Sequence, residues 1–224
     1  MEQYKKEFAK FLITTGALSF GEFTLKSGRK SPYFLNTGGF DDGERISRLG
    51  YFYASAIKEN FGEDFDVVFG PSYKGVPLAV TAAISLARDF KINKKYSFNR
   101  KEQKDHAEKG FLVGSEVKDG DSIVMLDDVF TTGDTKVEMV DTFKEIADVT
   151  FKGLLIALDR KETNTEGQSA IQNFTEKYSV PVISVITIHE VLDILYQKEI
   201  DGTVYLGDSE KEAIESYLSE YGVS

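Results

Sequence analysis

The sequence SIVMLDDVFTTGDT, residues 122–135, joins an apolar run, two adjacent carboxylates and a turn rich in threonine. The apolar run Ser122–Leu126 predicts a buried strand, and the residues after the turn predict a helix. Gly133 and the small hydroxylic residues around it allow backbone N–H groups to converge on an anion at the start of that helix. Asp127 and Asp128 suit hydroxyl groups, or a divalent cation through water. The stretch therefore predicts a sugar-phosphate site, with hydroxyls on the acids and phosphate in the turn.

Two adjacent aspartates are most simply a helix N-cap before an ordinary turn, but the complete string disfavours that interpretation. Other phosphate-binding motifs fit the chain less well. Gly70 and Gly75 have the glycine spacing of a P-loop, but Val76 stands where that motif requires lysine. Val129 stands where a phosphatase-type Asp-x-Asp pair has its second acid. The complete string therefore favours a sugar-phosphate site.

Short apolar runs and longer amphipathic runs alternate along most of the chain. Such alternation predicts an α/β fold with a central, mostly parallel sheet flanked by helices. Ligands of these sheets bind beyond the carboxyl ends of the strands, so the residues that follow each strand are the candidates for function. Strands are predicted over residues 67–69, 95–98, 122–126, 151–158 and 182–186, and helices over 46–59, 76–90, 135–147, 171–178 and 189–197.

The first 40 residues predict a small addition to this sheet. Apolar residues at helical spacing predict a helix over residues 4–18. Two short strands, 23–25 and 33–35, follow and are joined by a polar turn. We therefore expect residues 1–224 to form a single domain, in which residues 1–40 contribute an N-terminal helix and hood.

Composition excludes several classes of protein. The 224 residues include 27 Lys and Arg against 37 Asp and Glu, and the resulting net charge of −10 argues against a general nucleic-acid-binding surface. The absence of cysteine excludes disulfides, thiolate catalysis and cysteine-ligated metals. No apolar run approaches the ~20 residues of a membrane span. Because residues 1–10 are polar rather than leader-like, we expect a cytoplasmic protein without a membrane partner.

The 122–135 stretch resembles the phosphoribosyl pyrophosphate (PRPP) binding motif of type I phosphoribosyltransferases. Segments 20–36, 69–77 and 98–110 resemble the orotate phosphoribosyltransferase family in their order and spacing, and the similarity extends to Leu158-Asp159-Arg160-Lys161. The resemblance covers essentially the whole chain. It implies the type I phosphoribosyltransferase fold and a glycosyltransferase that moves the 5-phosphoribosyl group from PRPP to N1 of orotate. The products would be diphosphate and orotidine 5′-monophosphate, a precursor of UMP.

The resemblance also implies roles for individual residues. Those expected to assist catalysis are Lys26, Lys74, Arg100, Lys104, His106, Asp127 and Asp128. Those expected to bind PRPP are these seven together with Tyr73, Lys101, Val129, Phe130, Thr131, Thr132, Gly133, Asp134 and Thr135. Those expected to bind orotate are Lys26, Phe34, Leu35, Thr131 and Arg160.

The chemistry of two segments supports these roles. Residues 98–110 carry four Lys or Arg against three acids and lack apolar periodicity, which predicts a long loop. Cations on a closing loop can neutralise the charge of a leaving diphosphate and exclude water, whereas the alternative is a solvated loop of mixed charge. Lys26, Arg29 and Lys30 form a cationic cluster in an acidic chain. Asp134 is an exception, because an acid beside a phosphate is unfavourable unless it points away or caps the helix.

The resemblance further implies a cofactor and an assembly. Mg²⁺ is expected to bind mainly through PRPP and water, with no direct protein ligand. A homodimer is expected, in which loop 98–110 reaches the neighbouring site and Lys101 acts across the interface. Two alternatives stay open: a phosphoribosyltransferase for a purine or another base, and a non-catalytic PRPP-sensing regulator on the same fold. We do not expect a fused decarboxylase, because its barrel needs ~250 further residues.

Overall fold

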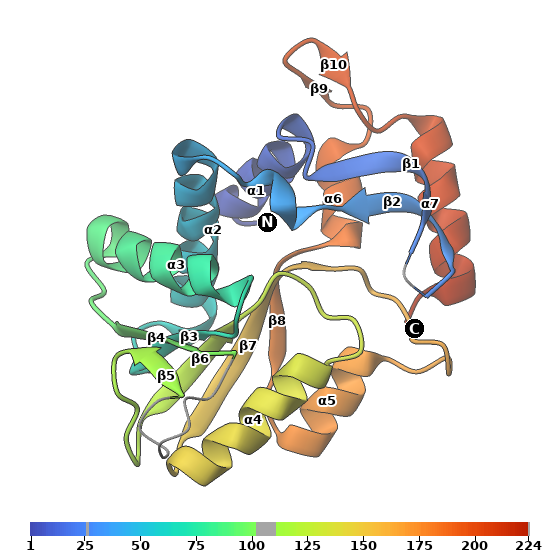
Figure 1. Cartoon of the computed structure of the whole chain (residues 1–224). Coiled ribbons are helices and arrows are strands. Elements are labelled where there is room, and N and C mark those ends of the chain that lie inside the picture. Colours follow the sequence, from blue (N-terminus) through green and yellow to red (C-terminus); the bar gives the residue numbers. More distant parts are fainter. Residues whose placement is uncertain (26, 102–110, 224) are drawn as a thin grey trace. The chain divides into compact units, whose positions relative to one another are not determined.

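The computed structural model describes residues 1–25, 27–101 and 111–223, and the chain divides into two compact units (Figure 1). Unit 1 comprises Met1–Asp41, Leu158–Ala170 and Ile186–Ser224. Unit 2 comprises Asp42–Ala157 and Ile171–Val185.

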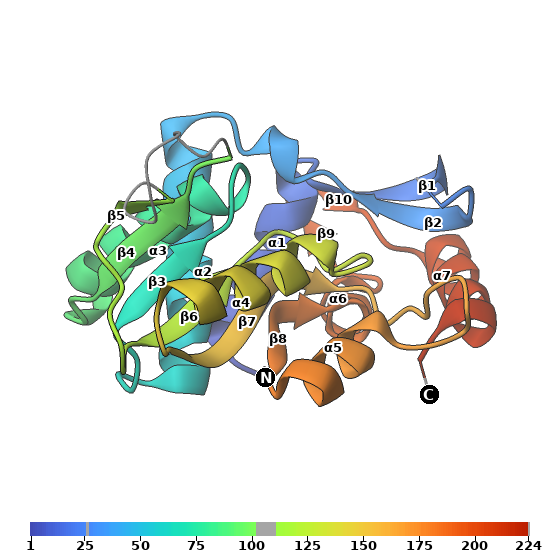
Figure 2. The same cartoon turned by 60° about the horizontal axis from the view of Figure 1, so that its bottom comes forward.

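Among the described residues, unit 2 is built on a six-stranded sheet with the strand order β5-β4-β3-β6-β7-β8 (Figure 2). β3 pairs in parallel with β4 and β6, and β6 pairs in parallel with β7, while β5 is antiparallel to β4. The predicted α/β fold with a mostly parallel sheet is therefore confirmed. The strands are β3 (Val67–Gly70), β4 (Lys95–Asn99), β5 (Leu112–Gly114), β6 (Ser122–Leu126), β7 (Thr150–Asp159) and β8 (Val182–Thr187).

Helices cover both faces of this sheet. α2 (Gly43–Phe61) and α3 (Gly75–Phe90) pack together on one face, and α4 (Asp134–Ile146) and α5 (Ala170–Tyr178) lie on the other (Figures 1 and 2). Alternate residues of a strand point to opposite faces, so every second residue of the central strands enters the core beneath α4 and α5. That core includes Phe69 and Phe143, whose rings meet edge-on with centroids 4.9 Å apart. Each buried side chain of this size contributes about 1.5–3 kcal/mol to folding.

A glycine lets α2 and α3 approach closely. A Cβ atom built on Gly50 would lie 2.6 Å from the Cβ of Thr81 and 2.7 Å from its carbonyl. No side chain can therefore replace hydrogen at residue 50 without moving one helix. The two helices therefore pack closely together on this face of the sheet.

Unit 1 consists of a β-hairpin and the helices that pack with it. The hairpin strands pair antiparallel from Leu18 opposite Leu35 to Thr24 opposite Lys30, with an irregular register between Phe20 and Phe23. α7 contacts β2, and α1 contacts α6. The elements are α1 (Gln3–Thr14), β1 (Leu18–Thr24), β2 (Lys30–Leu35), the 3₁₀ helix η1 (Thr37–Gly39), α6 (Ile188–Leu195), β9 (Glu199–Ile200), β10 (Thr203–Val204) and α7 (Asp208–Tyr221).

Two parts of the sequence prediction need correction. The first helix ends at Thr14 rather than at residue 18, because the chain turns at Gly16 (φ 71°) and Leu18 already begins β1. The C-terminal helix α7 was not predicted, because Ile214 and Tyr217 are its only fully buried residues and they give no apolar stripe. The short strands β5, β9 and β10 were also missed. In the ranges that the structure describes, every helix is too short or too polar to cross a membrane.

Candidate active site

The acid pair lies where β6 ends. Asp127 and Asp128 are both buried, and pairing with the neighbouring strand β7 continues through them. The Asp127 N–H donates to the Leu155 carbonyl at 3.0 Å, and the Ala157 N–H donates to the Asp128 carbonyl at 3.0 Å. The sheet therefore fixes the backbone of both acids before the chain enters the turn.

Each of the two carboxylates has a lysine partner. Lys136 forms an ion pair with Oδ2 of Asp127 and donates to the Val129 carbonyl at 2.9 Å. Lys74 donates to Oδ2 of Asp128 at 2.6 Å. The Lys136 side chain is only 8% exposed, whereas that of Lys74 is 66% exposed. The first lysine is therefore part of the interior, and the second lies largely in solvent.

The acid pair also perturbs its surroundings. Burial raises the pKa of Asp127 above its ordinary value, an effect that the Lys136 ammonium opposes and the Asp128 carboxylate increases. Tyr53, from α2, is fully buried and donates its hydroxyl to the Asp127 carbonyl at 2.7 Å. Burial, and then the two carboxylates, hold the pKa of Tyr53 well above its ordinary value. Tyr53 therefore stays a neutral hydrogen-bond donor beneath the pair.

The turn after the acids requires glycine. Gly133 is the N-cap of α4 with φ 86°, and a Cβ atom there would lie 2.7 Å from the Phe130 ring. Phe130 in turn packs against Phe174 with ring centroids 5.5 Å apart. The packing of Phe130 thus fixes one side of the turn, while the side chains on its other side are exposed to solvent. These exposed residues are Thr131, Thr132, Asp134 and Thr135.

Asp134 is the first residue of α4 and not its cap. Its carboxylate accepts a hydrogen bond from Thr132 Oγ1 at 2.7 Å. The acid that sequence reasoning found unfavourable beside a phosphate is thus engaged by a hydroxyl of the same turn. The first turn of α4 keeps its partial positive charge toward solvent.

Two further groups of predicted residues lie at the carboxyl ends of neighbouring strands. Tyr73 and Lys74 follow β3, and Arg100 and Lys101 follow β4. The strand ends are tied together by Asn99, whose Oδ1 accepts from the Ser72 N–H at 2.7 Å. The Lys101 ammonium lies 5.3 Å from the centre of the exposed Tyr73 ring. Because β3, β4 and β6 are parallel neighbours, these residues share one edge of the sheet with the acid pair.

Three predicted residues, Lys26, Lys104 and His106, lie outside the described residues.

In unit 1, the predicted base-binding residues of the hairpin face opposite ways. Phe34 is 40% exposed and stacks on Phe23 with ring centroids 5.5 Å apart. Leu35 is only 9% exposed, as the alternation of β2 requires. Phe34 is therefore the more accessible of the two.

Arg160 follows β7 and is held by a set of polar contacts within unit 1. Its Nε donates to Glu162 Oε1 at 2.8 Å, its Nη2 donates to Ser31 Oγ at 2.8 Å, and its guanidinium lies 4.1 Å from the Tyr33 ring centre. Burial alone would lower the pKa of Arg160, but the neighbouring Tyr33 and Glu162 raise it above the ordinary value. The guanidinium is therefore a permanent, oriented cation.

Sequence reasoning missed three residues of this framework: Lys136, Tyr53 and Glu162. The signal for Lys136 was present, because it is spaced three and seven residues before Met139 and Phe143 on the buried stripe of α4. A lysine on such a stripe needs a buried partner. Glu162 stands two residues after Arg160, whereas nothing in the sequence distinguished Tyr53 from other core aromatics.

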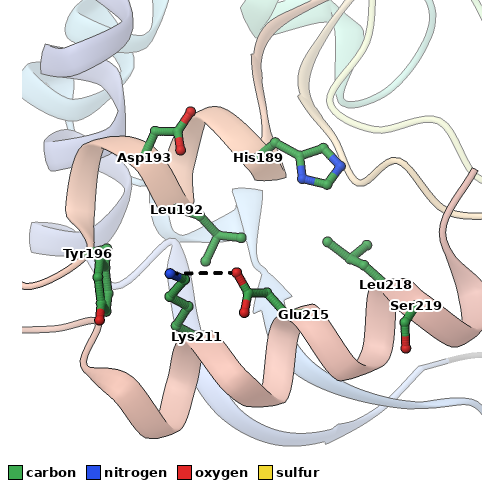
Figure 3. A pocket seen from close by; sticks show the side chains of 8 residues that line it. All are labelled: His189, Leu192, Asp193, Tyr196, Lys211, Glu215, Leu218 and Ser219. Atoms are coloured by element: carbon green, nitrogen blue, oxygen red, sulfur yellow. Dashed lines mark ion pairs between the residues drawn. The ribbon is translucent and has the colours of Figure 1, made fainter. Parts of the chain in front are cut away.

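Away from the acid pair, the described residues hold no metal cluster, and unit 1 holds a pocket. Within the described ranges, no group of three or more acidic or histidine side chains is placed to hold a metal ion. Unit 1 contains a pocket of about 570 Å³ between α6 and α7, and none of its lining residues was predicted as a site residue (Figure 3). The lining residues are His189, Leu192, Asp193, Tyr196, Lys211, Glu215, Leu218 and Ser219.

Comparison with known proteins extends this picture. The chain matches the family model described as a phosphoribosyl transferase domain over residues 38–180. It is 47% identical over 222 residues to the orotate phosphoribosyltransferase of Clostridium beijerinckii, with 99% of each chain covered. It is 46% identical over 224 residues to the orotate phosphoribosyltransferase of Agathobacter rectalis, again with 99% of each chain covered. The crystal structure of orotate phosphoribosyltransferase from Francisella tularensis matches with a TM-score of 0.83 and 30% identity, covering 97% of this chain and 100% of the other.

Proposed function

Because this chain belongs to the orotate phosphoribosyltransferase family, we propose that it transfers the 5-phosphoribosyl group of PRPP to N1 of orotate. The products are orotidine 5′-monophosphate and diphosphate, so the enzyme is a pentosyltransferase of UMP biosynthesis. Identity over nearly the full chain confirms the resemblance found in the sequence. The observation that carries the proposal is the buried acid pair, placed where β6 runs into the glycine-capped helix α4.

PRPP binding is divided between the acids and the turn. Asp127 and Asp128 accept hydrogen bonds from the ribose hydroxyls, because a carboxylate oxygen with spare lone pairs is a strong acceptor. Backbone N–H groups at the start of α4 bind the 5-phosphate, whose charge the helix N-terminus favours. The turn residues that take part are Val129, Phe130, Thr131, Thr132, Gly133, Asp134 and Thr135.

The difficult part of the reaction is charge separation. The C1–O bond to diphosphate breaks with its electron pair on the leaving group, N1 of orotate forms the new bond to C1, and the N1 proton passes to the diphosphate or to water. N1 of orotate is itself the nucleophile in this displacement, so no protein nucleophile is needed. Cations around the leaving group stabilise its departure, each contributing about 10²–10³-fold by analogy with oxyanion donors. These residues are Lys26, Lys74, Arg100, Lys101, Lys104 and His106, with Tyr73 beside them.

Lys74 links the two halves of the PRPP site. In the structure its ammonium donates to Asp128 at 2.6 Å, although most of its side chain is exposed. We propose that Lys74 turns to the diphosphate when PRPP binds and leaves Asp128 free to accept a ribose hydroxyl. The exchange keeps Asp128 hydrogen-bonded in both states, so its buried oxygen is never left without a donor.

Magnesium fits this arrangement as an ion carried by the substrate. Lys136 stays paired with Asp127, and a ribose hydroxyl is proposed to take the place of Lys74 on Asp128, so neither carboxylate is proposed as a direct ligand of the ion. Mg²⁺ held by PRPP and water supplies further positive charge to the departing diphosphate.

The base site is proposed from residues of unit 1. Arg160 pairs with the orotate carboxylate, for which its fixed guanidinium is suited. Phe34 offers an exposed aromatic face to the pyrimidine. Lys26 and Leu35 are carried over from the sequence prediction.

Assembly and location are also proposals. We propose that the whole chain works as one phosphoribosyltransferase domain and forms a homodimer, in which loop 98–110 completes the neighbouring site. We propose that the enzyme is located in the cytoplasm, and cell fractionation can test this location.

The decisive experiment measures loss of orotate absorbance after PRPP and Mg²⁺ are added to the purified chain. We expect turnover with orotate and none with hypoxanthine, adenine or uracil. Asp128→Asn is the control, because it keeps the shape of the acid and removes its charge. Turnover with a purine but not with orotate would show that orotate is not the substrate. PRPP binding without turnover of any base would favour a non-catalytic, PRPP-sensing regulator.

A further inference from the structure

Lys136 is a buried cation that touches two parts of the PRPP site at once. Its ammonium pairs with Asp127 Oδ2 and donates to the Val129 carbonyl at 2.9 Å. It also lies 5.8 Å from the centre of the Phe130 ring. The same group therefore contacts an acid that is proposed to bind the ribose and the peptide where the turn after β6 begins.

Fold stability alone is a weak reason for a lysine at this position. Removing an ammonium and a carboxylate from water costs several kcal/mol per ion, and apolar residues of similar size often replace such a pair without loss of stability. Lys136 lies on the buried stripe of α4 with Met139, Val140 and Phe143, so an apolar residue at position 136 together with an uncharged one at position 127 would suit the fold equally well. The charge therefore calls for a functional explanation.

We propose that Lys136 is a positioning residue for PRPP, an inference that rests on the function proposed above. Asp127 has two anchored oxygens: Oδ2 pairs with Lys136, and Oδ1 accepts the Asp128 N–H at 2.8 Å. A carboxylate has about four lone-pair sites, so two remain for ribose hydroxyls once the anchors are made. Without Lys136 the carboxylate keeps a single anchor and can rotate away from the sugar.

Lys136 and Lys74 have different proposed roles in PRPP binding. Lys74 is exposed and can exchange its carboxylate for a ligand, whereas Lys136 is enclosed and bound to a backbone carbonyl. Lys136 thus keeps the ribose acceptor and the phosphate turn in a fixed relation while PRPP enters. Lys136 is therefore expected to increase the affinity for PRPP and not the affinity for orotate.

The test compares four variants in the assay described above: Lys136→Met, Lys136→Arg, Asp127→Asn and the double variant Asp127→Asn/Lys136→Met. We expect Lys136→Met to raise KM for PRPP roughly 10–100-fold, as loss of an orienting partner commonly does, and to leave KM for orotate within about twofold. Lys136→Arg should recover much of the PRPP affinity. In the Asp127→Asn background the second change should have little further effect, because there is no charged carboxylate left to orient.

A matched control lies on the same helix. Lys144→Met removes an exposed lysine of α4 that pairs with Asp141, and it should change neither KM. If Lys136→Met fails to fold, the arginine variant and the double variant, which buries no unpaired charge, still decide the question. The positioning role is wrong if Lys136→Met leaves KM for PRPP unchanged or raises both KM values equally. It is also wrong if the increase in KM for PRPP in the double variant equals the product of the increases in the two single variants.

The role of Lys136 in PRPP binding can be tested separately from the proposed reaction. Calorimetric titration with PRPP measures the same affinities without turnover. If the wild-type chain binds PRPP but does not consume orotate, the proposed reaction fails while the effect of Lys136 on PRPP affinity is still measured. If the wild-type chain does not bind PRPP, both proposals are wrong.

Discussion

At the scale of single residues, Glu162 determines how Arg160 is presented. The carboxylate of Glu162 accepts from Arg160 Nε at 2.8 Å and from the Tyr33 hydroxyl at 2.7 Å. Both partners are largely buried, so the carboxylate holds a cation and a phenol in fixed positions. If Arg160 binds orotate, the position of its guanidinium in the base site depends on Glu162.

We therefore expect Glu162→Gln to weaken orotate binding more than PRPP binding. The amide keeps the shape but loses the charge, and hydrogen bonds to a charged group contribute about 1.5–3 kcal/mol. KM for orotate should rise about tenfold while KM for PRPP stays within about twofold. Steady-state kinetics with each substrate varied in turn measures the split. Glu166→Gln, at an exposed position of the same segment, is the control, and equal changes in both KM values would contradict the assignment.

Asp66 gives a prediction on pH and stability. Its Oδ2 accepts from the Ser122 N–H at 2.8 Å and from Ser122 Oγ at 2.7 Å, and these hydrogen bonds lower the pKa of Asp66 below its ordinary value. Because the folded pKa is the lower one, this stabilisation is complete above the unfolded pKa of about 3.9 and is lost as the pH falls through the folded value. Urea unfolding of the wild type and Asp66→Asn should show a constant difference in free energy above about pH 5 that shrinks in acid. A difference that grows in acid would show that the sign is wrong.

At the scale of elements, the turn between β6 and α4 depends on one glycine. Gly133 has φ 86°, and any side chain there would meet the Phe130 ring. Gly133→Ala therefore combines backbone strain of about 1 kcal/mol or more with displacement of the turn that is proposed to bind the 5-phosphate. We expect KM for PRPP to rise at least about tenfold, because a displaced phosphate turn loses several backbone hydrogen bonds at once.

Gly120→Ala is the matched control for that variant. Gly120 has φ 85° in the same unit, but a Cβ atom there would meet nothing within 4 Å. Both variants should lose stability in thermal unfolding, whereas only Gly133→Ala should lose PRPP affinity. Equal kinetic behaviour of the two would show that strain alone, and not the position of the turn, explains the loss.

The sequence predicted the elements of the sheet well and those of the C-terminal part poorly, for physical reasons. Strands β3 and β6, and β7 from Leu154 to Leu158, are buried on both faces, so each contains a continuous apolar run. Helix α7 has only two fully buried residues and packs on β2 of the distant hairpin, which no local pattern reveals. The acid pair and its turn form one continuous string and could be predicted, whereas Lys136 and Glu162 matter through partners that only the folded chain identifies.

At the scale of the whole molecule, charge is distributed unevenly. The net charge is −10, yet the proposed diphosphate site gathers cations from segments far apart in the sequence. Concentrating these cations in one place lets an acidic protein bind a multiply charged anion. In the proposed homodimer, part of this positive charge comes from the loop of the neighbouring subunit.

A hybrid experiment tests that assembly. Lys104→Ala and Asp128→Asn should each lower turnover by about 10²–10³-fold if Lys104 and Asp128 act as proposed. When the two variants are unfolded together and refolded as a mixture, half of the dimers are hybrids. If the loop acts across the interface, one site of each hybrid combines an intact Asp128 with an intact Lys104 of the other subunit. The mixture should then recover about a quarter of the wild-type activity, as expected for random pairing in a two-fold symmetric dimer. If each loop serves its own subunit, every site lacks one of the two residues, and refolding the mixture restores nothing.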